Sequence, residues 1–404
     1  GFARAGAGGI MNEVLLSQVR HPAEAGLNAA RLDVLSQAFE REISNGLLPG
    51  MAALISRRGR IGYFECRGQL SPASPTPMAR DSIFRIYSMT KPVVSVAVLM
   101  LAEQGRLLLH EPVSTWLPQF SQMQVGVELG GRLEYEPARA PITIHDLLRH
   151  TAGLTYGFLG SSPVQQLYTE ERMGAPEIAN AKFCEQLARL PLMAQPGTAW
   201  AYSHATDVLG RVIEVISGQP LSQFLREQIF TPLHMVDTGF HVPASEQHRI
   251  AEPFELDPQT GAKIELLDVR RIHAFESAGS GLVSTASDYA RFLYGLYHVE
   301  GGTRILGRHT LALMTADHLG HMPVLGDVLP AGHGFGLGFA VRREAGLAAV
   351  PGSKGLYYWG GIAGTSFFVD PVEQLFAVLM IQAPVQRHRY RALFRHLVYA
   401  ALDD

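Results

Sequence analysis

The sequence has few cysteines, no clustered metal ligands and little lysine. Only two of its 404 residues are cysteine, Cys66 and Cys184, and they match neither a zinc-ligand spacing nor a disulfide framework. We therefore expect two buried free thiols. The 16 histidines form no His-Glu-x-x-His pattern, so the sequence predicts no metal site.

Charge and hydropathy exclude several kinds of partner. A formal net charge of -3 gives no basic surface for nucleic acid or for an anionic membrane. The longest apolar run, Val93 to Leu101, is about half as long as a membrane-spanning helix. The start, Gly1 to Ile10, lacks the apolar core of a secretory signal and is either a native tail or an addition ahead of Met11. We expect a cytoplasmic protein that acts on a small molecule, of undetermined oligomeric state.

Strand signals near both ends of the chain predict a single sheet. A helix is expected around Leu32 to Ile43, followed by a hairpin of Met51 to Ser56 and Arg60 to Arg67. The chain closes with an amphipathic helix from Arg389 to Leu402. Later strands are expected at Gly281 to Ser284, Leu356 to Trp359, Ser366 to Val369 and Leu375 to Gln382, with a hairpin loop at Asp370 to Gln374.

Helices separated by Pro/Gly-rich loops are expected in the middle of the chain. A capping box at Thr143 to Asp146 begins a helix that should end near Gly153, and another helix is expected from Asp207 to Ile216. We predict an α+β fold with an antiparallel sheet flanked by helices plus a helical subdomain. The sheet domain would comprise residues 1–110 and 276–404, and the mainly helical subdomain residues 111–275.

Ser88-Met89-Thr90-Lys91 opens the most apolar helix of the chain. A spacing of three places Ser88 and Lys91 on one helix face, and the helix N-terminus adds positive potential beside the hydroxyl. Only four of the 34 basic residues are lysine. A lysine at this position, in a chain that otherwise uses arginine, indicates a need for an amine that can lose its proton. The alternative is a serine cap followed by a surface lysine.

Two later patterns could complete an active site. Tyr202-Ser203-His204 precedes a helix, and a tyrosine can act as an acid or base when cations hold its phenolate. Trp359-Gly360-Gly361-Ile362 ends a predicted strand, where paired glycines allow close approach to a ligand and a backbone N–H can bind an oxyanion. Taken alone, the first pattern is more typical of a core tyrosine and a structural histidine, and the second is more typical of a turn.

Together, these three patterns resemble the serine beta-lactamase-like superfamily, whose members carry Ser-x-x-Lys, then Tyr-x-Asn or a relative, then Lys-Thr-Gly or a relative. The segments Asp146 to Leu154, Gly279 to Leu282 and Trp359 to Gly361 further resemble the family VIII carboxylesterases, which are esterases similar to class C beta-lactamases. The resemblance spans roughly residues 30 to 400. It implies a beta-lactamase/penicillin-binding-protein-like fold with the active site between the sheet and a helical region.

The resemblance also implies a role for each matching residue. Ser88 would be acylated, Lys91 and Tyr202 would move its proton, and the backbone N–H groups of Ser88 and Ile362 would form the oxyanion hole. No cofactor is required. The substrate would be bound by Trp359, Gly360, Gly361 and His204.

The sequence departs from the lactamase pattern at two positions. His204 stands where Asn is usual, and Trp359 replaces the lysine of Lys-Thr-Gly. An ammonium could pair with the carboxylate of a penicillin, whereas an indole offers an apolar wall and one N–H donor. We therefore rank a neutral acyl ester above an anionic lactam.

The leading interpretation is a serine carboxylesterase acting on short-chain acyl esters, with weak beta-lactam hydrolysis as an accompanying activity. The enzymatic alternatives are an acyltransferase and a beta-lactamase or penicillin-binding hydrolase. The remaining hypothesis, from a different class of function, is a non-catalytic binding module of the same fold. His204 is also a candidate base for deacylation. No serine lies in a Gly-x-Ser-x-Gly elbow, which disfavours the α/β-hydrolase fold.

Overall fold

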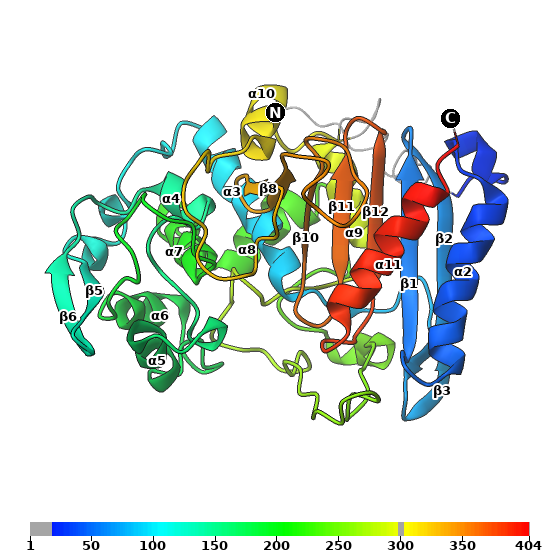
Figure 1. Ribbon diagram of the computed structural model, residues 1–404, viewed down its shortest axis with the longest axis horizontal. Coiled ribbons are helices and arrows are strands. Elements are labelled where there is room, and N and C mark those ends of the chain that lie inside the picture. Colours follow the sequence, from blue (N-terminus) through cyan, green and yellow to red (C-terminus); the bar gives the residue numbers. More distant parts are fainter. Residues whose placement is uncertain (1–17, 298–302, 404) are drawn as a thin grey trace.

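An eight-stranded antiparallel sheet lies beside a group of helices in the computed structural model, which describes residues 18–297 and 303–403 (Figure 1). The strand order is β3-β2-β1-β12-β11-β10-β9-β8, so the first three and the last five strands of the chain form one sheet. β1 pairs with β12, with Ala52 opposite Met380. The predicted α+β fold with one sheet built from both ends of the chain is confirmed.

The predicted strands of this sheet are present except the one expected at Gly281 to Ser284, which lies outside the sheet. The first hairpin turns at Arg58 and Gly59, whose φ angles of 53° and 74° suit the tight turn that matches strand twist. The sequence did not indicate β3, β8 and β9, which are only three or four residues long and too short to show an alternating pattern. The strands are β1 (Gly50–Arg57), β2 (Arg60–Ser71), β3 (Ser74–Pro77), β8 (His333–Phe335), β9 (Ala340–Arg342), β10 (Tyr357–Gly360), β11 (Ser366–Asp370) and β12 (Leu375–Met380).

Helices cover both faces of the sheet. α2 (Ala29–Ser44) and α11 (Arg387–Ala400) pack on one face, where Met51 and Ala53 of β1 join their core. The intervening Ala52 belongs to the main core, which includes α9 (Ala286–Leu296). β1 is therefore buried along its whole length, which explains why it reads as a continuous apolar run.

The second part of the molecule consists mostly of helices (Figure 1). α3 carries an almost fully buried apolar sequence and contacts α7, so it joins the helical part to the sheet. The expected helix at 207–216 is confirmed as α7, which ends at Gly218 in the left-handed conformation. The helices of this part are α3 (Thr90–Glu103), α4 (Ile144–Leu148), α5 (Pro163–Glu170), α6 (Asn180–Leu187), α7 (Ala205–Ser217), α8 (Leu221–Leu225) and α10 (Arg308–Thr315).

Three expectations for the middle of the chain need correction. α4 begins with the predicted capping box but ends at Leu148, because His150 turns the chain with a φ of 58°. A hairpin of β5 (Gln124–Leu129) and β6 (Arg132–Pro137) lies within the region expected to be helical. The strand expected from 281 is only β7 (Val283–Ser284), and it pairs with β4 (Phe84–Arg85) outside the main sheet. The division into two domains stays a prediction.

The two cysteines differ in exposure. Both are free, and Cys184 is buried as predicted, but Cys66 is only half-buried. Burial raises the pKa of the Cys66 thiol to about 11. Within the described residues, no helix has the length and apolar character needed to cross a membrane. The segment 1–10 lies outside the described residues.

Candidate active site

Ser88 lies on a short 3-10 turn, Tyr87–Met89, between β4 and α3. The sequence placed it at the start of the helix itself, but α3 begins at Thr90. Tyr87 has a φ of 41°, an unusual conformation for a residue with a bulky side chain. Its hydroxyl accepts a hydrogen bond from Leu267 N at 2.7 Å, which helps hold this turn and the serine that follows.

The structure brings the three predicted catalytic residues together. Lys91 Nζ donates to Ser88 Oγ at 3.3 Å. Tyr202 Oη lies 2.8 Å from the same oxygen. Lys91 Nζ also lies 4.6 Å from the centre of the Tyr202 ring, which is within the range of a cation–π contact. A serine hydroxyl with two such neighbours can lose its proton during attack on a substrate.

Lys91 is fully buried, and each of its donors has an acceptor. Besides Ser88, it donates to Tyr156 Oη at 3.0 Å and to the carbonyl oxygen of Gly279 at 2.8 Å. An ammonium has three N–H donors, and these three oxygens account for all of them. Tyr156 was not among the predicted site residues, although it follows the Asp146 to Leu154 motif by only two residues.

Two tyrosines therefore contact the Ser88–Lys91 pair, and their surroundings differ. Burial raises the pKa of Tyr156 well above its usual value, and the nearby Tyr202 and Asp207 raise it further. Tyr156 consequently remains a neutral phenol and is a poor base. Tyr202 instead contacts the serine oxygen directly and receives a hydrogen bond from Trp359 Nε1 at 3.1 Å. This geometry favours Tyr202 over Tyr156 for proton transfer.

The end of β10 lies against the turn that carries Ser88. A Cβ at Gly361 would come within 2.3 Å of the carbonyl oxygen of Ile86, so only glycine fits there. The next residue, Ile362, has a partly exposed side chain. An oxyanion hole between Ser88 N and Ile362 N, and substrate binding by Gly360 and Gly361, are compatible with this close approach and stay predictions.

Trp359 lies under the site rather than at its surface. Its side chain is buried, and its indole N–H is directed at Tyr202 Oη. The ring also packs against Tyr202 with 5.3 Å between centroids. The N–H of Trp359 is therefore already engaged by Tyr202, and the apolar wall expected from its indole stays a prediction. Its role in substrate binding stays a prediction.

His204 is engaged by a buried carboxylate. Its Nδ1 lies 3.0 Å from Asp207 Oδ2, and its ring packs on Tyr156 at 4.3 Å. Burial would raise the pKa of Asp207, but the hydrogen bond from His204, the charges of His204 and Lys91 and the N–H of Gly279 together lower it. Among the described residues, no hydrogen bond links His204 to Ser88, so its predicted contact with substrate stays a prediction.

Asp207 is a further residue that the sequence analysis did not assign to the site. Its Oδ1 accepts from Ser277 Oγ at 2.7 Å and from Gly279 N at 2.9 Å. Gly279 in turn offers its carbonyl oxygen to Lys91. The carboxylate thus fixes the loop that holds the lysine, a relation across 72 residues that no local pattern reveals.

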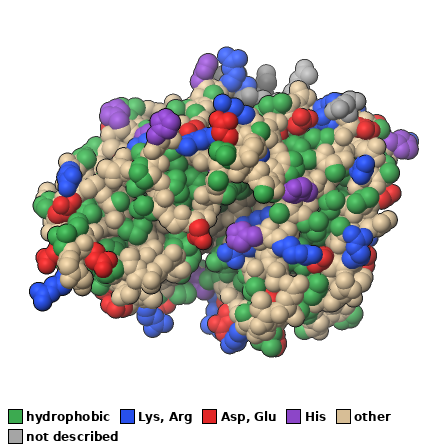
Figure 2. All heavy atoms as spheres, in the orientation of Figure 1, with side chains coloured by type: hydrophobic (Ala, Val, Ile, Leu, Met, Phe, Trp, Pro, Cys, Tyr) green, Lys and Arg blue, Asp and Glu red, His purple; other side chains and the backbone are tan. Residues whose placement is uncertain are grey.

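The face shown in Figure 2 is hollowed near its centre, between the helical part and the sheet. A cavity of about 110 Å³ has Tyr87 and Ser280 in its wall. Tyr87 precedes Ser88 and Ser280 follows Gly279 in the sequence, but Ser88, Lys91 and Tyr202 themselves do not line this cavity. Most of its other lining side chains are apolar, namely Pro176, Phe240, Leu267 and Phe275.

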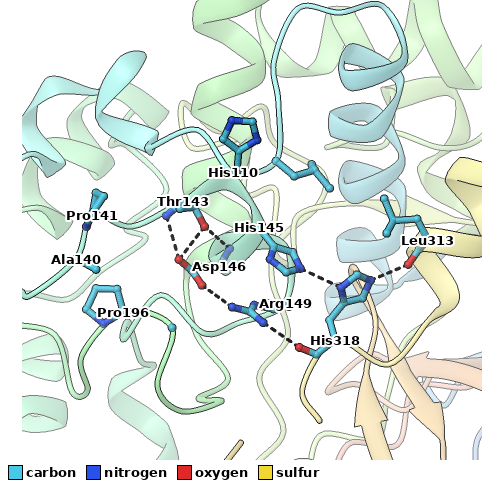
Figure 3. A pocket seen from close by; sticks show the side chains of 12 residues that line it. His110, Ala140, Pro141, Thr143, His145, Asp146, Arg149, Pro196, Leu313 and His318 are labelled. Atoms are coloured by element: carbon cyan, nitrogen blue, oxygen red, sulfur yellow. Dashed lines mark hydrogen bonds and ion pairs between the residues drawn. The ribbon is translucent and has the colours of Figure 1, made fainter.

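A wider pocket of about 590 Å³ lies away from Ser88. Figure 3 shows His145 facing His318, with Arg149 placed between Asp146 and the backbone of His318. His145 Nε2 and His318 Nδ1 are 2.9 Å apart. None of the predicted catalytic residues lines this pocket, so size alone does not make it the site of chemistry.

The chain matches known proteins over nearly its full length. A model of the family described as Beta-lactamase matches residues 35–400. The chain belongs to the beta-lactamase family. Protein Rv1367c of Mycobacterium tuberculosis is 36% identical over 361 residues, which cover 86% of this chain and 89% of that protein. Esterase EstB of Burkholderia gladioli is 32% identical over 377 residues, covering 88% and 91%.

A solved structure supports the same assignment. EstCE1, described as a hydrolase with promiscuous acyltransferase activity, superposes with a TM-score of 0.76 at 30% identity, covering 96% of this chain and 100% of that chain. The beta-lactamase/penicillin-binding-protein-like fold and the resemblance to family VIII-like esterases are confirmed. This beta-lactamase-family chain is a serine hydrolase whose relatives include esterases. Within its described residues, no group of three or more His, Cys, Asp or Glu side chains is placed to hold a metal ion.

Proposed function

We propose that this beta-lactamase-family protein is a carboxylesterase that hydrolyses short-chain acyl esters through an acyl-enzyme on Ser88. The observation that carries the proposal is the position of Ser88 Oγ, 3.3 Å from Lys91 Nζ and 2.8 Å from Tyr202 Oη. The described part of the chain supplies a nucleophile, a proton acceptor and a cation at a single point.

In the proposed reaction, Tyr202 acts as its phenolate, beside Lys91 and the Trp359 N–H. Ser88 Oγ attacks the ester carbonyl carbon while its proton moves to this phenolate oxygen. The backbone N–H groups of Ser88 and Ile362 hold the carbonyl oxygen as it becomes negative. Collapse of the tetrahedral intermediate breaks the bond to the alcohol oxygen, and the proton passes from Tyr202 to that oxygen. Water then attacks the acyl-enzyme, releasing the carboxylic acid and restoring the serine.

We infer that the acyl chain enters the cavity whose wall includes Tyr87, the residue before Ser88. Its small volume of about 110 Å³ favours a short acyl chain. Trp359 supports an uncharged substrate because the family's lysine is absent from that position. We expect kcat/KM to be highest for acetate to butyrate esters and to fall for octanoate. Phe275→Ala, which enlarges the cavity, should improve octanoate relative to acetate.

The central test compares the wild type with Ser88→Ala on p-nitrophenyl butyrate, with the intact protein mass recorded during turnover. Loss of both hydrolysis and the butyryl adduct in the variant is expected. Hydrolysis that persists in Ser88→Ala would contradict the proposal. A wild type that neither turns over the ester nor reacts with a fluorophosphonate would favour a non-catalytic binding module.

Acyl transfer is the second candidate activity. It is favoured by the likeness to EstCE1, which is described as a hydrolase with promiscuous acyltransferase activity. An alcohol could replace water in the attack on the acyl-enzyme, so the same site would make a new ester. Adding methanol to the butyrate assay and measuring methyl butyrate against butyric acid separates transfer from hydrolysis. A chromogenic cephalosporin should remain largely intact in the same assay.

A further inference from the structure

One arginine of α11 reaches the end of β10. Arg391 Nη2 donates to the carbonyl oxygen of Gly361 and, at 3.0 Å, to that of Thr365. A Cβ added at Gly360 would lie 2.6 Å from the guanidinium carbon, so the guanidinium packs directly on the strand backbone. This contact joins the last helix of the chain to the segment that contains the predicted oxyanion donor.

The carbonyl of Gly361 and the N–H of Ile362 belong to the same peptide group. Because a trans peptide is planar, these two groups point in opposite directions. A donor that holds the Gly361 oxygen on the side of α11 therefore directs the Ile362 N–H away from α11. On the other side, Ile86 O would be 2.3 Å from a Gly361 Cβ, so the peptide is confined between α11 and the segment leading to Ser88.

The hydrogen bond from Arg391 to the carbonyl oxygen of Gly361 is donated by a charged group. Burial, followed by repulsion from Arg387, lowers the pKa of Arg391 to about 10, yet this value keeps the guanidinium charged near neutral pH. A cation bound to a carbonyl oxygen polarises the amide and strengthens its N–H as a donor. Gly364 N also donates to Gly361 O at 3.0 Å, but that donor is neutral.

We propose that Arg391 is a positioning residue for ester hydrolysis, which holds and polarises the Gly361–Ile362 peptide so that Ile362 N–H binds the developing oxyanion. The inference rests on the proposed function at Ser88. It gives α11 a part in catalysis in addition to its packing on the sheet. Arg391 acts through the peptide and does not itself contact the substrate.

The test compares an ester with its thionoester, in which sulfur replaces the carbonyl oxygen and accepts hydrogen bonds weakly. For Arg391→Met we expect kcat/KM on the ester to fall roughly tenfold, less than the about 100-fold or more that follows removal of an oxyanion donor. The thionoester rate should change less than about twofold, because it depends little on the oxyanion hole. Arg391→Lys, which keeps the charge, should restore part of the ester rate.

Arg395→Met is the matched control. Arg395 is on the same helix and is buried, whereas Arg391 is half-buried, and the Arg395 guanidinium lies over the Tyr358 ring at 4.4 Å. This variant should keep the wild-type ratio of ester to thionoester rates, even if its melting temperature falls. If Arg391→Met does not fold, the ratio in Arg391→Lys decides the question.

Two outcomes would overturn the inference. Equal losses on ester and thionoester in the Arg391 variants would show a merely structural role, and an unchanged ester rate would show none. A wild type without hydrolysis or an acyl adduct on Ser88 would instead reject the proposed function together with this inference. The two failures are therefore distinguished by the wild-type measurement.

Discussion

The indole N–H of Trp359 donates to the phenolic oxygen of Tyr202 at 3.1 Å. The same oxygen contacts Ser88 Oγ, so a neutral donor on β10 supports the tyrosine at the position where the family pattern has lysine. The substitution removes a charge that would attract an anionic substrate but retains a hydrogen bond to the tyrosine. This arrangement gives the first of four predictions.

Trp359→Phe should lower kcat for p-nitrophenyl butyrate by about 10- to 100-fold, because the indole N–H stabilises the phenolate that accepts the serine proton and a hydrogen bond to a charged group contributes about 1.5–3 kcal/mol. Trp200→Phe is the control. Its ring also lies against Tyr202, at 6.1 Å, but its Nε1 has no partner among the described residues. Both variants lose the same ring volume, so the difference between their steady-state rates measures the effect of the Trp359 N–H. Equal rates would show that this N–H is unimportant.

Substitution of Tyr202 should slow acylation more than substitution of Tyr156. Tyr202→Phe removes the group that contacts Ser88 Oγ and should slow acylation by about 100- to 10,000-fold. Tyr156→Phe removes only a partner of Lys91 and should cost about 10- to 100-fold, since a hydrogen bond to a charged group contributes about 1.5–3 kcal/mol. Stopped-flow measurement of the p-nitrophenol burst tests both. A larger loss in Tyr156→Phe would reverse the assigned roles.

Gly361→Ala should reduce kcat at least about 100-fold, because the added Cβ would meet Ile86 O at 2.3 Å and displace the oxyanion peptide. Gly346→Ala provides the control, since a Cβ there has no neighbour within 4 Å. Esterase rates and melting temperatures should be recorded for both. An active Gly361→Ala would remove this strand end from the proposed oxyanion hole.

Stability should fall in acid because of the histidine pair in the wider pocket. Burial, then the charge of Arg149, lowers the pKa of His145 from 6.5 to about 4, and burial also lowers that of His318. Between about pH 6.5 and about pH 4, the two histidines bind more protons in the unfolded chain than in the folded chain. The free energy of unfolding therefore decreases as the pH falls through this range.

Urea unfolding at pH 7 and pH 5 measures this effect. His145→Gln should reduce the pH-dependent loss by about 1 kcal/mol, a figure discounted for the partial solvent access of the pair. His110→Gln is the control, as His110 lines the same pocket but forms no hydrogen bond among the described residues. Identical pH dependence in all three proteins would refute the assignment.

Much of the fold follows from local sequence patterns. The alternating and continuous apolar runs predicted α2, the β1–β2 hairpin, β10 to β12 and α11, because burial of one or both faces leaves a periodic signal. The β5–β6 hairpin was missed. Its strands are mostly exposed, so little burial shaped their sequence.

The sequence by itself determined the reactive groups: Ser88 and Lys91 are one helical turn apart, and the order of motifs brought Tyr202 into the set. Only the tertiary structure decided which groups complete the site. Tyr156, Asp207 and Gly279 meet Lys91 or its loop from distant segments. Arg391 joins β10 in the same way, through a contact across 30 residues. Hydrogen bonds between distant segments depend on how the sheet and helices pack, and packing leaves no fixed spacing in the sequence.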